Sequence, residues 1–419
     1  MADQYDVTGA DISDDVPQDE LDFVYGPGGG TTEVVPLVER RREFKPWHHP
    51  VKQIVRNRQW GALTQRLIGD IRPTITTLRY FTLPGPDLLD VRVLADVCAP
   101  QEIKVEFFGF DTAVVENGAD GERTHADVSA AADAQAVLRQ AGRITDESVV
   151  IRGRLEDIAI TRTHEANQLR AQQPFHVINI DACNHLTFRQ EGAKNLFDAL
   201  QELLRHQTRA EDPWLLFLTT RCSPDRLCDA GDEFKNRIAA NLELSPDEFK
   251  KALASVLNVD IADLEAALEA GWAARDANFL KLYVIGFGKY LLHLYNGQPA
   301  SPADVELVST YAYTIHPDDP PMLALAFRIT PSGPQMYPPS TGGMVPLRDL
   351  EPTRAVRVAE RAGRLWLLDE ALNEFEIRRE AVDGTVNLLR NANYDMAAWR
   401  EWVTRHPTRP VDLVGTVAE

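Results

Sequence analysis

Five short apolar or β-branched runs recur between residues 78 and 219, and each ends at a polar or glycine-bearing turn. The runs are LRYFTL (78–83), KVEFFGF (104–110), SVVIRG (148–153), FHVINI (175–180) and WLLFLT (214–219). Their almost continuous apolarity is typical of parallel strands buried on both faces. Because most of the intervening segments have a helical period, the pattern predicts strand–helix units wound into a Rossmann-like sheet.

The pattern changes after the fifth run. Residues 228–275 are predicted to form a helical insertion, and residues 278–295 are predicted to form a long, largely buried helix. Two further strand runs, 305–315 and 322–330, are separated only by HPDDPP. Because so short a connection cannot make a parallel crossover, these two runs are predicted to form an antiparallel hairpin.

Shifts in composition divide the chain into four parts. Residues 1–38 are expected to be disordered, because the first 23 residues carry eight Asp or Glu and no Lys or Arg, and a glycine-rich stretch follows. Residues 39–72 form a basic arm, with nine Lys or Arg against three Asp or Glu. Residues 73–335 contain the predicted sheet. Residues 336–419 begin with a Pro/Gly-rich loop and read as a helical appendage.

The overall composition is that of a globular protein, with 44% hydrophobic and 26% charged residues. No apolar run approaches the roughly 18 residues that suggest a membrane span. The N-terminus lacks the features of a signal peptide, and four scattered cysteines do not indicate a disulfide framework. We therefore expect a soluble, cytoplasmic protein without a membrane partner. The net charge of -19 argues against a surface that coats nucleic acid nonspecifically.

The order of five strand–helix units, a helix and a closing hairpin, over about residues 73–331, resembles the class I S-adenosylmethionine-dependent methyltransferases. The resemblance implies an α/β fold with a doubly wound, mostly parallel sheet of seven strands. It also implies that the seventh strand inserts antiparallel beside the fifth, and that S-adenosylmethionine is the cofactor.

Candidate cofactor residues follow the first strand run. In an open parallel sheet, ligands bind beyond the carboxyl ends of the strands. The resemblance places an acid and a glycine-rich turn here, and Gly85 and Asp87 in LPGPD are the matching residues. Pro84 and Pro86 flank the single glycine and remove backbone amides that could bind the cofactor. An ordinary strand-to-helix turn is the alternative interpretation.

The next two strand runs also end at acids. Asp111 stands where the resemblance implies a carboxylate that accepts hydrogen bonds from two ribose hydroxyls. Glu156 and Asp157 stand beyond the third run, where the family usually contacts adenine. Helix capping at Asp111 and plain surface positions for Glu156 and Asp157 are the alternatives.

Candidate catalytic residues follow the fourth strand run, in DACNH (181–185). This stretch and the later WLLFLTTRC loosely resemble the tRNA guanine-N2 methyltransferases, in which a strand enters an Asp-Pro-Phe-Gly turn. Asp181 matches the acid, while Ala182, Cys183 and Asn184 replace the other three residues. The resemblance implies that Asp181 and Asn184, with His185 beside them, orient an acceptor for in-line attack on the methyl group, a reaction governed by positioning.

The basic arm combines cations with aromatic rings, as backbone phosphate contacts and base stacking require. Its candidate contact residues for a nucleic acid or nucleotide-like acceptor are Lys45, Trp47, His48, His49, Lys52 and Arg56. Alternatively, the arm forms an amphipathic helix that packs its Ile54, Trp60 and Leu63 side on the sheet with its charges outward. It could also pair with the acidic residues 1–23.

A zinc site is the less favoured interpretation of Cys222 and Cys228 with Cys183 and His185, because their spacing differs from that of usual zinc motifs and small buried cysteines are common. We therefore expect no metal. The leading hypothesis is a methyltransferase acting on a nucleic acid or nucleotide-like acceptor. The alternative is a noncatalytic scaffold that binds a partner protein or nucleic acid. A dinucleotide-dependent enzyme is disfavoured by the single glycine and the closing hairpin.

Overall fold

The computed structural model describes most of the chain beyond its first 39 residues. The described residues are 40–72, 75–111, 125–188, 193–244, 246–296, 302–315, 319–332 and 351–407. The chain divides into Met1–Arg41 and one compact unit, Arg42–Glu419. The expected disorder of residues 1–38 therefore concerns residues outside the described part.

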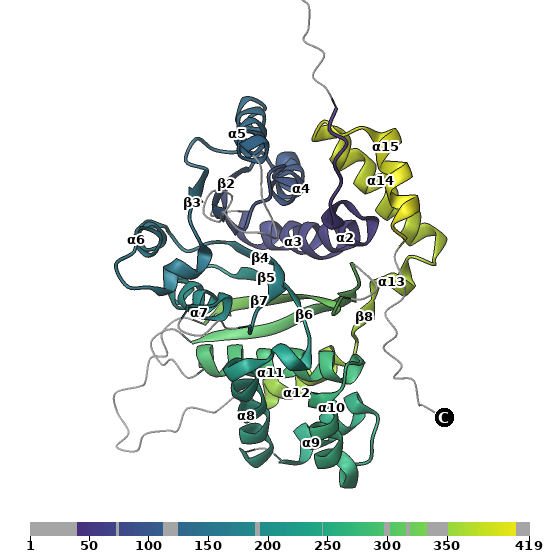
Figure 1. Ribbon diagram of the computed structural model, residues 1–419. Coiled ribbons are helices and arrows are strands. Elements are labelled where there is room, and N and C mark those ends of the chain that lie inside the picture. Colours follow the sequence, from purple (N-terminus) through teal and green to yellow (C-terminus); the bar gives the residue numbers. More distant parts are fainter. Residues whose placement is uncertain are drawn as a thin grey trace, which may run out of the picture. The chain divides into compact units, whose positions relative to one another are not determined.

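An eight-stranded sheet forms the centre of this unit, in the order β3-β2-β1-β4-β5-β7-β6-β8 (Figure 1). The strands are β1 (Thr77–Thr82), β2 (Lys104–Asp111), β3 (Val149–Arg152), β4 (Val177–His185), β5 (Trp214–Arg221), β6 (Ala303–Tyr313), β7 (Met322–Pro331) and β8 (Trp366–Leu367). The first five are parallel to one another, while β7 runs antiparallel to both β5 and β6. The predicted mostly parallel α/β sheet is confirmed.

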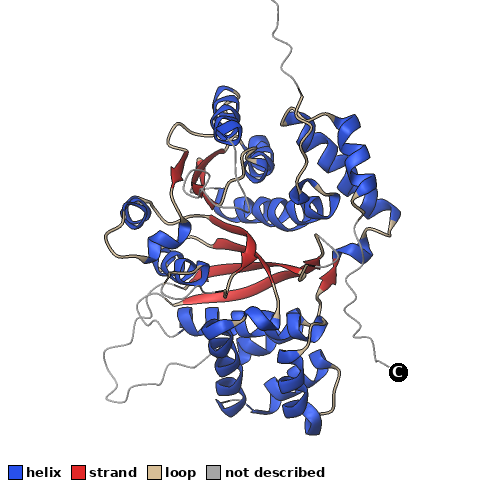
Figure 2. Cartoon of the chain, in the orientation of Figure 1, coloured by secondary structure: helices blue, strands red, loops and turns tan. Residues whose placement is uncertain are grey.

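Both faces of the sheet are buried, which explains the continuous apolar runs. In β5, Leu216 and Leu218 belong to one hydrophobic core, and Leu215 and Phe217 belong to the other. All four side chains are almost completely inaccessible. Helices cover both cores, as Figure 2 shows.

The helices with residues in the first core are η5 (Leu155–Ala159), α6 (His164–Ala171), α7 (Leu196–Gln207), α8 (Cys228–Leu244), α9 (Pro246–Leu257), α10 (Leu264–Ala273), α11 (Ala277–Asn296) and α12 (Glu351–Ala362). Two short helices, η6 (Pro224–Arg226) and η7 (Ile261–Asp263), lie between them and have no buried residue. The elements from α8 to α10 occupy the predicted insertion. Helix α11 carries the long apolar segment, and 14 of its residues are buried.

The second core is covered by helices from both ends of the chain. The helices with residues in this core are α2 (Pro50–Ile54), η2 (Val55–Gly61), α3 (Ala62–Ile71), α4 (Leu89–Cys98), α5 (His125–Gln140), α13 (Leu368–Ala371) and α14 (Phe375–Asn391). The short η1 (Pro46–His48) and α15 (Met396–Arg405) pack with α4 and α14 in a third, smaller cluster, and η4 (Ala99–Gln101) follows α4 without a buried residue. Among the described residues, no helix is both long and apolar enough to cross a membrane.

The predicted basic arm is part of this second layer and not a separate segment. Its residues form η1, α2, the π-helix η2 and α3. Ile54, Trp60 and Leu63 are buried in the core, as the amphipathic alternative predicts. The expectation that the charges point outward is wrong for Lys52 and Arg56, which are each 3% exposed.

The predicted C-terminal appendage is likewise integrated into the unit. Residues 366–367 were expected within a helix but form β8, which pairs with β6 through Tyr311 and Ala312 and brings the sheet to eight strands. Helix α12 packs on α9 and α11, and α14 packs on α2. Residues 333–350, which contain the expected boundary near 335, lie outside the described residues.

Candidate functional site

A cavity of about 270 Å³ lies at the carboxyl ends of β1, β4 and β5. Its walls come from the helices before β1, the β1–α4 loop with the start of α4, β4 at Asp181 and Ala182, and the end of β5. Tyr313 and Ile315 at the end of β6 and Met322 at the start of β7 complete them. Because strand order reverses between β1 and β4, this cavity lies at the topological switch point, where open α/β sheets bind their ligands. We call it the strand-end pocket.

The β1–α4 loop brings Gly85 and Asp87 to the pocket. The loop is tight: the Leu88 amide donates to the carbonyl of Gly85 at 3.1 Å, and Leu88 has a φ of 50°. Asp87 is buried, and its Oδ2 accepts a hydrogen bond of 2.7 Å from the hydroxyl of Tyr394. The Nε2 of His48 lies 3.8 Å from the same oxygen. A residue near the C-terminus therefore holds the predicted cofactor loop in place.

Asp90, in the first turn of α4, also lines the pocket, although no sequence motif indicated it. Its Oδ2 accepts hydrogen bonds from the hydroxyls of Tyr80 and Thr82, while the Asn179 amide donates to Tyr80 at 3.0 Å. Burial raises the pKa of Asp90, although the two hydroxyl bonds oppose the shift. The network ties β1, β4 and α4 together at the pocket floor.

Asp181 and Lys52 form an ion pair across the pocket. The Lys52 Nζ lies 2.5 Å from Asp181 Oδ1 and 3.1 Å from the hydroxyl of Tyr313. It also lies 4.8 Å from the ring centre of Trp60. Burial alone would lower the pKa of Lys52, but the Asp181 carboxylate and Tyr313 outweigh burial, and the pKa is raised. Lys52 is therefore a charged, buried group.

Arg56 lies one helical turn after Lys52 and also lines the pocket. In the part of the chain that the structure describes, its guanidinium makes no hydrogen bond or ion pair. Burial lowers the pKa of Arg56, while the fields of Asp181 and Asp90 act in the opposite direction. Trp47, from η1, lines the same pocket. The pocket thus contains residues from all three predicted sets: cofactor, catalytic and contact.

The other two predicted catalytic residues do not line the pocket. The expected turn after Ile180 is wrong, because β4 continues to His185 with an irregular register between Asp181 and His185. The Asn184 side chain is exposed, and its carbonyl accepts from the Thr220 hydroxyl at 3.0 Å. In the pairing of β4 with β5, His185 lies opposite Arg221. Burial and two nearby arginines, Arg226 and Arg221, lower the pKa of His185.

The remaining predicted cofactor residues also stand outside the pocket lining. Asp111 ends β2, and its carbonyl accepts the Gly153 amide at 3.3 Å. The residues that follow it, 112–124, lie outside the described part. Glu156 and Asp157 lie in η5, where the Glu156 carboxylate is 3.7 Å from the Arg154 guanidinium. Asp111 is thus at the expected strand end but one strand away from β1.

Three predicted contact residues have local structural contacts. Lys45 is exposed and forms an ion pair with Glu43. His48 is buried, and its Nδ1 accepts the Lys45 amide at 3.0 Å. The Nδ1 of His49 accepts the Val51 amide at 3.3 Å at the start of α2, and burial lowers the pKa of His49 to about 4. Both histidines therefore shape the entry into α2.

The family assignment rests on a match over most of this unit. Residues 41–404 match the model of the PP_RS20740-like family. The chain belongs to this family. Comparison of the sequence with curated proteins found no match.

One solved structure similar to this PP_RS20740-like chain is a Listeria monocytogenes protein provisionally described as a class I S-adenosylmethionine-dependent methyltransferase. The TM-score is 0.31 and the sequence identity is 12%. The match covers 67% of this chain and 62% of the other.

The cysteines form no zinc site in the described part of this PP_RS20740-like chain. No group of three or more His, Cys, Asp or Glu residues there is arranged to hold a metal ion. Cys222 is buried, and burial raises its pKa, whereas Cys228 is exposed. The side chain of Cys183 lies outside the described residues.

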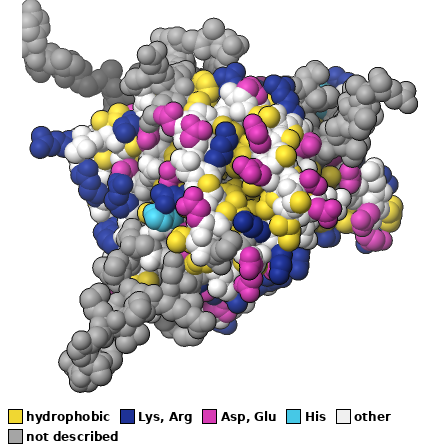
Figure 3. Space-filling view, turned by 90° about the horizontal axis from the view of Figure 1, so that it is seen from below, with side chains coloured by type: hydrophobic (Ala, Val, Ile, Leu, Met, Phe, Trp, Pro, Cys, Tyr) yellow, Lys and Arg dark blue, Asp and Glu magenta, His cyan; other side chains and the backbone are white. Residues whose placement is uncertain are grey.

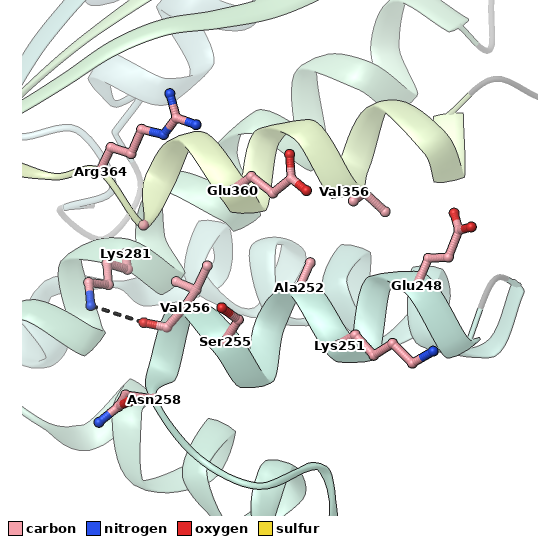
Figure 4. Close-up of a pocket in the computed structure, with 11 residues that line it drawn as sticks. Glu248, Lys251, Ala252, Ser255, Val256, Asn258, Lys281, Val356, Glu360 and Arg364 are labelled. Atoms are coloured by element: carbon pink, nitrogen blue, oxygen red, sulfur yellow. Dashed lines mark hydrogen bonds between the residues drawn. The ribbon is translucent and has the colours of Figure 1, made fainter.

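A second, larger cavity of about 780 Å³ lies between α9 and α12 (Figure 4). Charges of both signs line it, including Glu248, Lys251, Glu360 and Arg364. Lys281 donates to the Val256 carbonyl at 3.0 Å. Figure 3 shows the face of the molecule seen from below, where acidic and basic side chains surround hydrophobic ones. This cavity lies in the helical layer, away from the strand ends, so the strand-end pocket is the better candidate site.

Proposed function

We propose that this chain is a methyltransferase-like protein that binds S-adenosylmethionine, with the methionine end of the cofactor in the strand-end pocket. The observation that carries the proposal is the position of the pocket. It lies where the order β3-β2-β1-β4-β5-β7-β6 reverses, between β1 and β4, and both strand ends contribute to it. The antiparallel β7 between β5 and β6 supports the same assignment, because this arrangement is the one that the sequence resemblance implied.

The chemistry of the pocket fits the methionine end. That end carries a sulfonium, an ammonium and a carboxylate, so it needs both negative and positive partners. Asp87 offers a carboxylate to the cationic centres. Trp47 also lines the pocket, and an indole ring attracts a cation that lies over its face.

The size of the pocket fits part of the cofactor only. Its 270 Å³ falls just below the usual range of about 300–1,000 Å³ for sites that enclose a drug-sized ligand. The adenosine end would therefore extend outside the pocket, along the carboxyl edge of the sheet. Asp111, at the end of β2, is the residue that we propose for the ribose hydroxyls.

When bound, the cofactor would supply an electrophilic methyl group. The contribution of this chain would be to bind, orient and exclude water, which suits a reaction that depends on positioning. We propose that Asp181 orients the acceptor, because it is the one predicted catalytic residue that lines the pocket in the described part.

Isothermal titration calorimetry with S-adenosylmethionine and S-adenosylhomocysteine tests the proposal. We expect binding to the wild-type protein and at least a tenfold loss in Asp111→Ala. Asp146→Ala is the matched control, because Asp146 is exposed and lies before β3, at the other end of the strands. No binding of either ligand at high micromolar concentration would contradict the proposal.

The acceptor that we propose is a nucleic acid or nucleotide-like molecule, contacted by Lys45 and Trp47. Of the predicted arm cations, Lys45 is exposed, whereas Lys52 and Arg56 are buried. Lys45→Glu should weaken binding of single-stranded nucleic acid and reduce its dependence on salt by about one phosphate contact. Lys104→Glu, at the amino end of β2, is the control. Equal binding by both variants would exclude Lys45 as a contact residue.

A noncatalytic scaffold is the second candidate function. The observation that favours it is the Lys52–Asp181 ion pair, which occupies one oxygen of the carboxylate proposed to orient the acceptor. The exposed Asn184 side chain also leaves Asp181 without its predicted companion. Binding of S-adenosylhomocysteine, combined with no transfer of a labelled methyl group from S-adenosylmethionine to tRNA, DNA or nucleotides, would favour the scaffold.

A further inference from the structure

The Arg56 guanidinium is buried without a protein partner among the described residues. Its side chain is 3% exposed, and its Nε has no hydrogen-bond acceptor. A buried charge without a partner is strongly unfavourable, so such groups are normally paired or hydrogen-bonded. The cavity beside Arg56 is the place from which a partner could come.

The packing of η2 holds Arg56 at the cavity. Gln59 donates to the Ser309 hydroxyl at 2.9 Å and to the Ala324 carbonyl at 3.2 Å, which fixes the helix on β6 and β7. On another side, Gly384 of α14 packs against Gln53 and Asn57. These contacts hold η2, and Arg56 with it, beside the cavity. Element η2 is also a π-helix, a local irregularity that often marks functional sites.

The acids near Arg56 already have partners. Asp181 receives the Lys52 ammonium at 2.5 Å. Asp90 accepts hydrogen bonds from two hydroxyls of β1. Burial raises the pKa of Asp90, which favours its neutral form. The other pocket arginine, Arg221, pairs with Asp319 at 3.0 Å. Among the described residues, the Arg56 guanidinium therefore keeps hydrogen-bonding capacity for a bound anion.

The form of the pocket favours a carboxylate over a phosphate. A planar guanidinium binds a carboxylate through two parallel hydrogen bonds. Asp87 would repel a phosphate dianion, whereas it would attract an ammonium attached next to a carboxylate. A zwitterionic α-amino acid group has both features, and a 270 Å³ pocket is small.

We infer that Arg56 binds the α-carboxylate of an α-amino acid group, which, resting on the proposed function, is the methionine end of S-adenosylmethionine. The ammonium of the same group then faces Asp87. Arg56 is thus the residue by which the pocket distinguishes a ligand with an amino acid end from a plain nucleoside.

The test compares two ligands in calorimetry. S-adenosylhomocysteine has the amino acid end, and 5′-methylthioadenosine lacks it. In the wild-type protein we expect S-adenosylhomocysteine to bind more tightly. Arg56→Gln should lose about 10- to 100-fold in affinity for S-adenosylhomocysteine, the range for a hydrogen-bonded charged group, and little for 5′-methylthioadenosine. Arg56→Lys should recover part of the loss.

Arg58→Gln is the matched control, because Arg58 lies in the same π-helix but pairs with Glu380 at the surface. It should bind both ligands like the wild-type protein. The thermal midpoint without ligand checks the fold. Removing a buried cation that has no protein partner should leave the midpoint of Arg56→Gln unchanged or raise it, whereas a structural Arg56 would give a lower midpoint.

The possible failures are distinguishable when free L-methionine and its decarboxylated amine, 3-(methylthio)propylamine, are added as probes. Suppose that the wild-type protein binds S-adenosylhomocysteine, and that Arg56→Gln loses the same amount of affinity for S-adenosylhomocysteine and for 5′-methylthioadenosine. The Arg56 inference is then wrong and the proposed function stands. If the wild-type protein binds L-methionine in preference to the amine but not S-adenosylhomocysteine, the proposed cofactor is wrong and the carboxylate role stands. If the wild-type protein binds none of these ligands, the proposed cofactor and the carboxylate role of Arg56 are both wrong.

Discussion

The Nζ of Lys52 lies 2.5 Å from Oδ1 of Asp181, although 129 positions separate the two residues in the chain. The two sides of this ion pair are not equally exposed, since the side chain of Lys52 is 4% exposed and that of Asp181 is 27% exposed. Loss of either partner therefore leaves the other in a different environment. Asp181 alone can be hydrated, whereas Lys52 alone remains a buried cation.

This asymmetry predicts unequal effects of mutation. Asp181→Ala should lower the free energy of unfolding by about 3 kcal/mol, near the lower end of the range for breaking a buried ion pair, because among the described residues Lys52 then keeps the Tyr313 hydroxyl and the Trp60 ring as partners. Lys52→Met should cost less. The double variant should be more stable than Asp181→Ala. Urea unfolding of the three variants measures this order, and an equal loss in both single variants would show that the burial of Lys52 is not the cause.

The raised pKa of Asp369 predicts that the stability of the protein depends on pH. Burial raises its pKa to about 7, and its Oδ2 accepts the Thr314 amide at 2.7 Å, beside the pocket residue Ile315. Between pH 4 and 7 the unfolded carboxyl is ionised while the folded one keeps its proton. The contribution of Asp369 to the free energy of unfolding therefore falls as pH rises from 4 to 7, by at most about 1.4 kcal/mol per pH unit.

The variant Asp369→Asn keeps an acceptor for Thr314 and removes the titration. Its stability relative to the wild-type protein should therefore increase between pH 5 and pH 8 in urea unfolding. A relative stability that stays constant over this range would show that Asp369 does not titrate there.

Gly109, in β2, is predicted to be intolerant of a side chain. A Cβ atom there would lie 2.7 Å from Pro84 Cδ and 2.8 Å from the Thr82 carbonyl oxygen. Because both contacts are with the segment that enters the β1–α4 loop, Gly109→Ala should displace that loop and destabilise the protein by about 1–3 kcal/mol. Gly69→Ala is the control: a Cβ at Gly69 in α3 meets nothing within 4 Å, and this change should stabilise by about 0.5–1 kcal/mol. Thermal unfolding compares the two.

The strands were predictable because their signal is local. The run at 214–219 is apolar on both faces, and β5 spans Trp214–Arg221. The turn expected after Ile180 was not found, because an irregular register that depends on β5 extends β4 to His185. Strand β8 has only two residues, too few for any periodicity to show.

The pocket was only partly predictable, for a different reason. Gly85, Asp87 and Asp181 follow strand runs, and position alone indicated them. Lys52 and Arg56 read as surface charges, because a sequence does not reveal which cations are buried. Their environment depends on residues far along the chain, as does that of Asp87, which bonds to Tyr394 across 307 positions.

The contact between Tyr394 and Asp87 gives the last prediction. The Tyr394 hydroxyl donates to Asp87 Oδ2 at 2.7 Å, and Trp399 donates to the His48 carbonyl at 3.0 Å, so the C-terminal helices hold the β1–α4 loop and η1 beside the pocket. Tyr394→Phe removes the first contact. It should lower stability by about 1.5–3 kcal/mol, the range for hydrogen bonds to a charged group. It should also weaken binding of S-adenosylhomocysteine, because Asp87 lines the pocket.

Tyr295→Phe provides the matched comparison. Tyr295 is buried in α11 and donates to the Leu204 carbonyl at 3.0 Å, on the opposite side of the sheet from the C-terminal helices. Loss of this hydrogen bond should reduce the free energy of unfolding by about 0.5–1.5 kcal/mol and leave ligand affinity unchanged. Unfolding and calorimetry on both variants separate a positioning role from a general loss of stability. If the two variants bound S-adenosylhomocysteine equally well, Tyr394 would stabilise the fold without positioning Asp87 for the ligand.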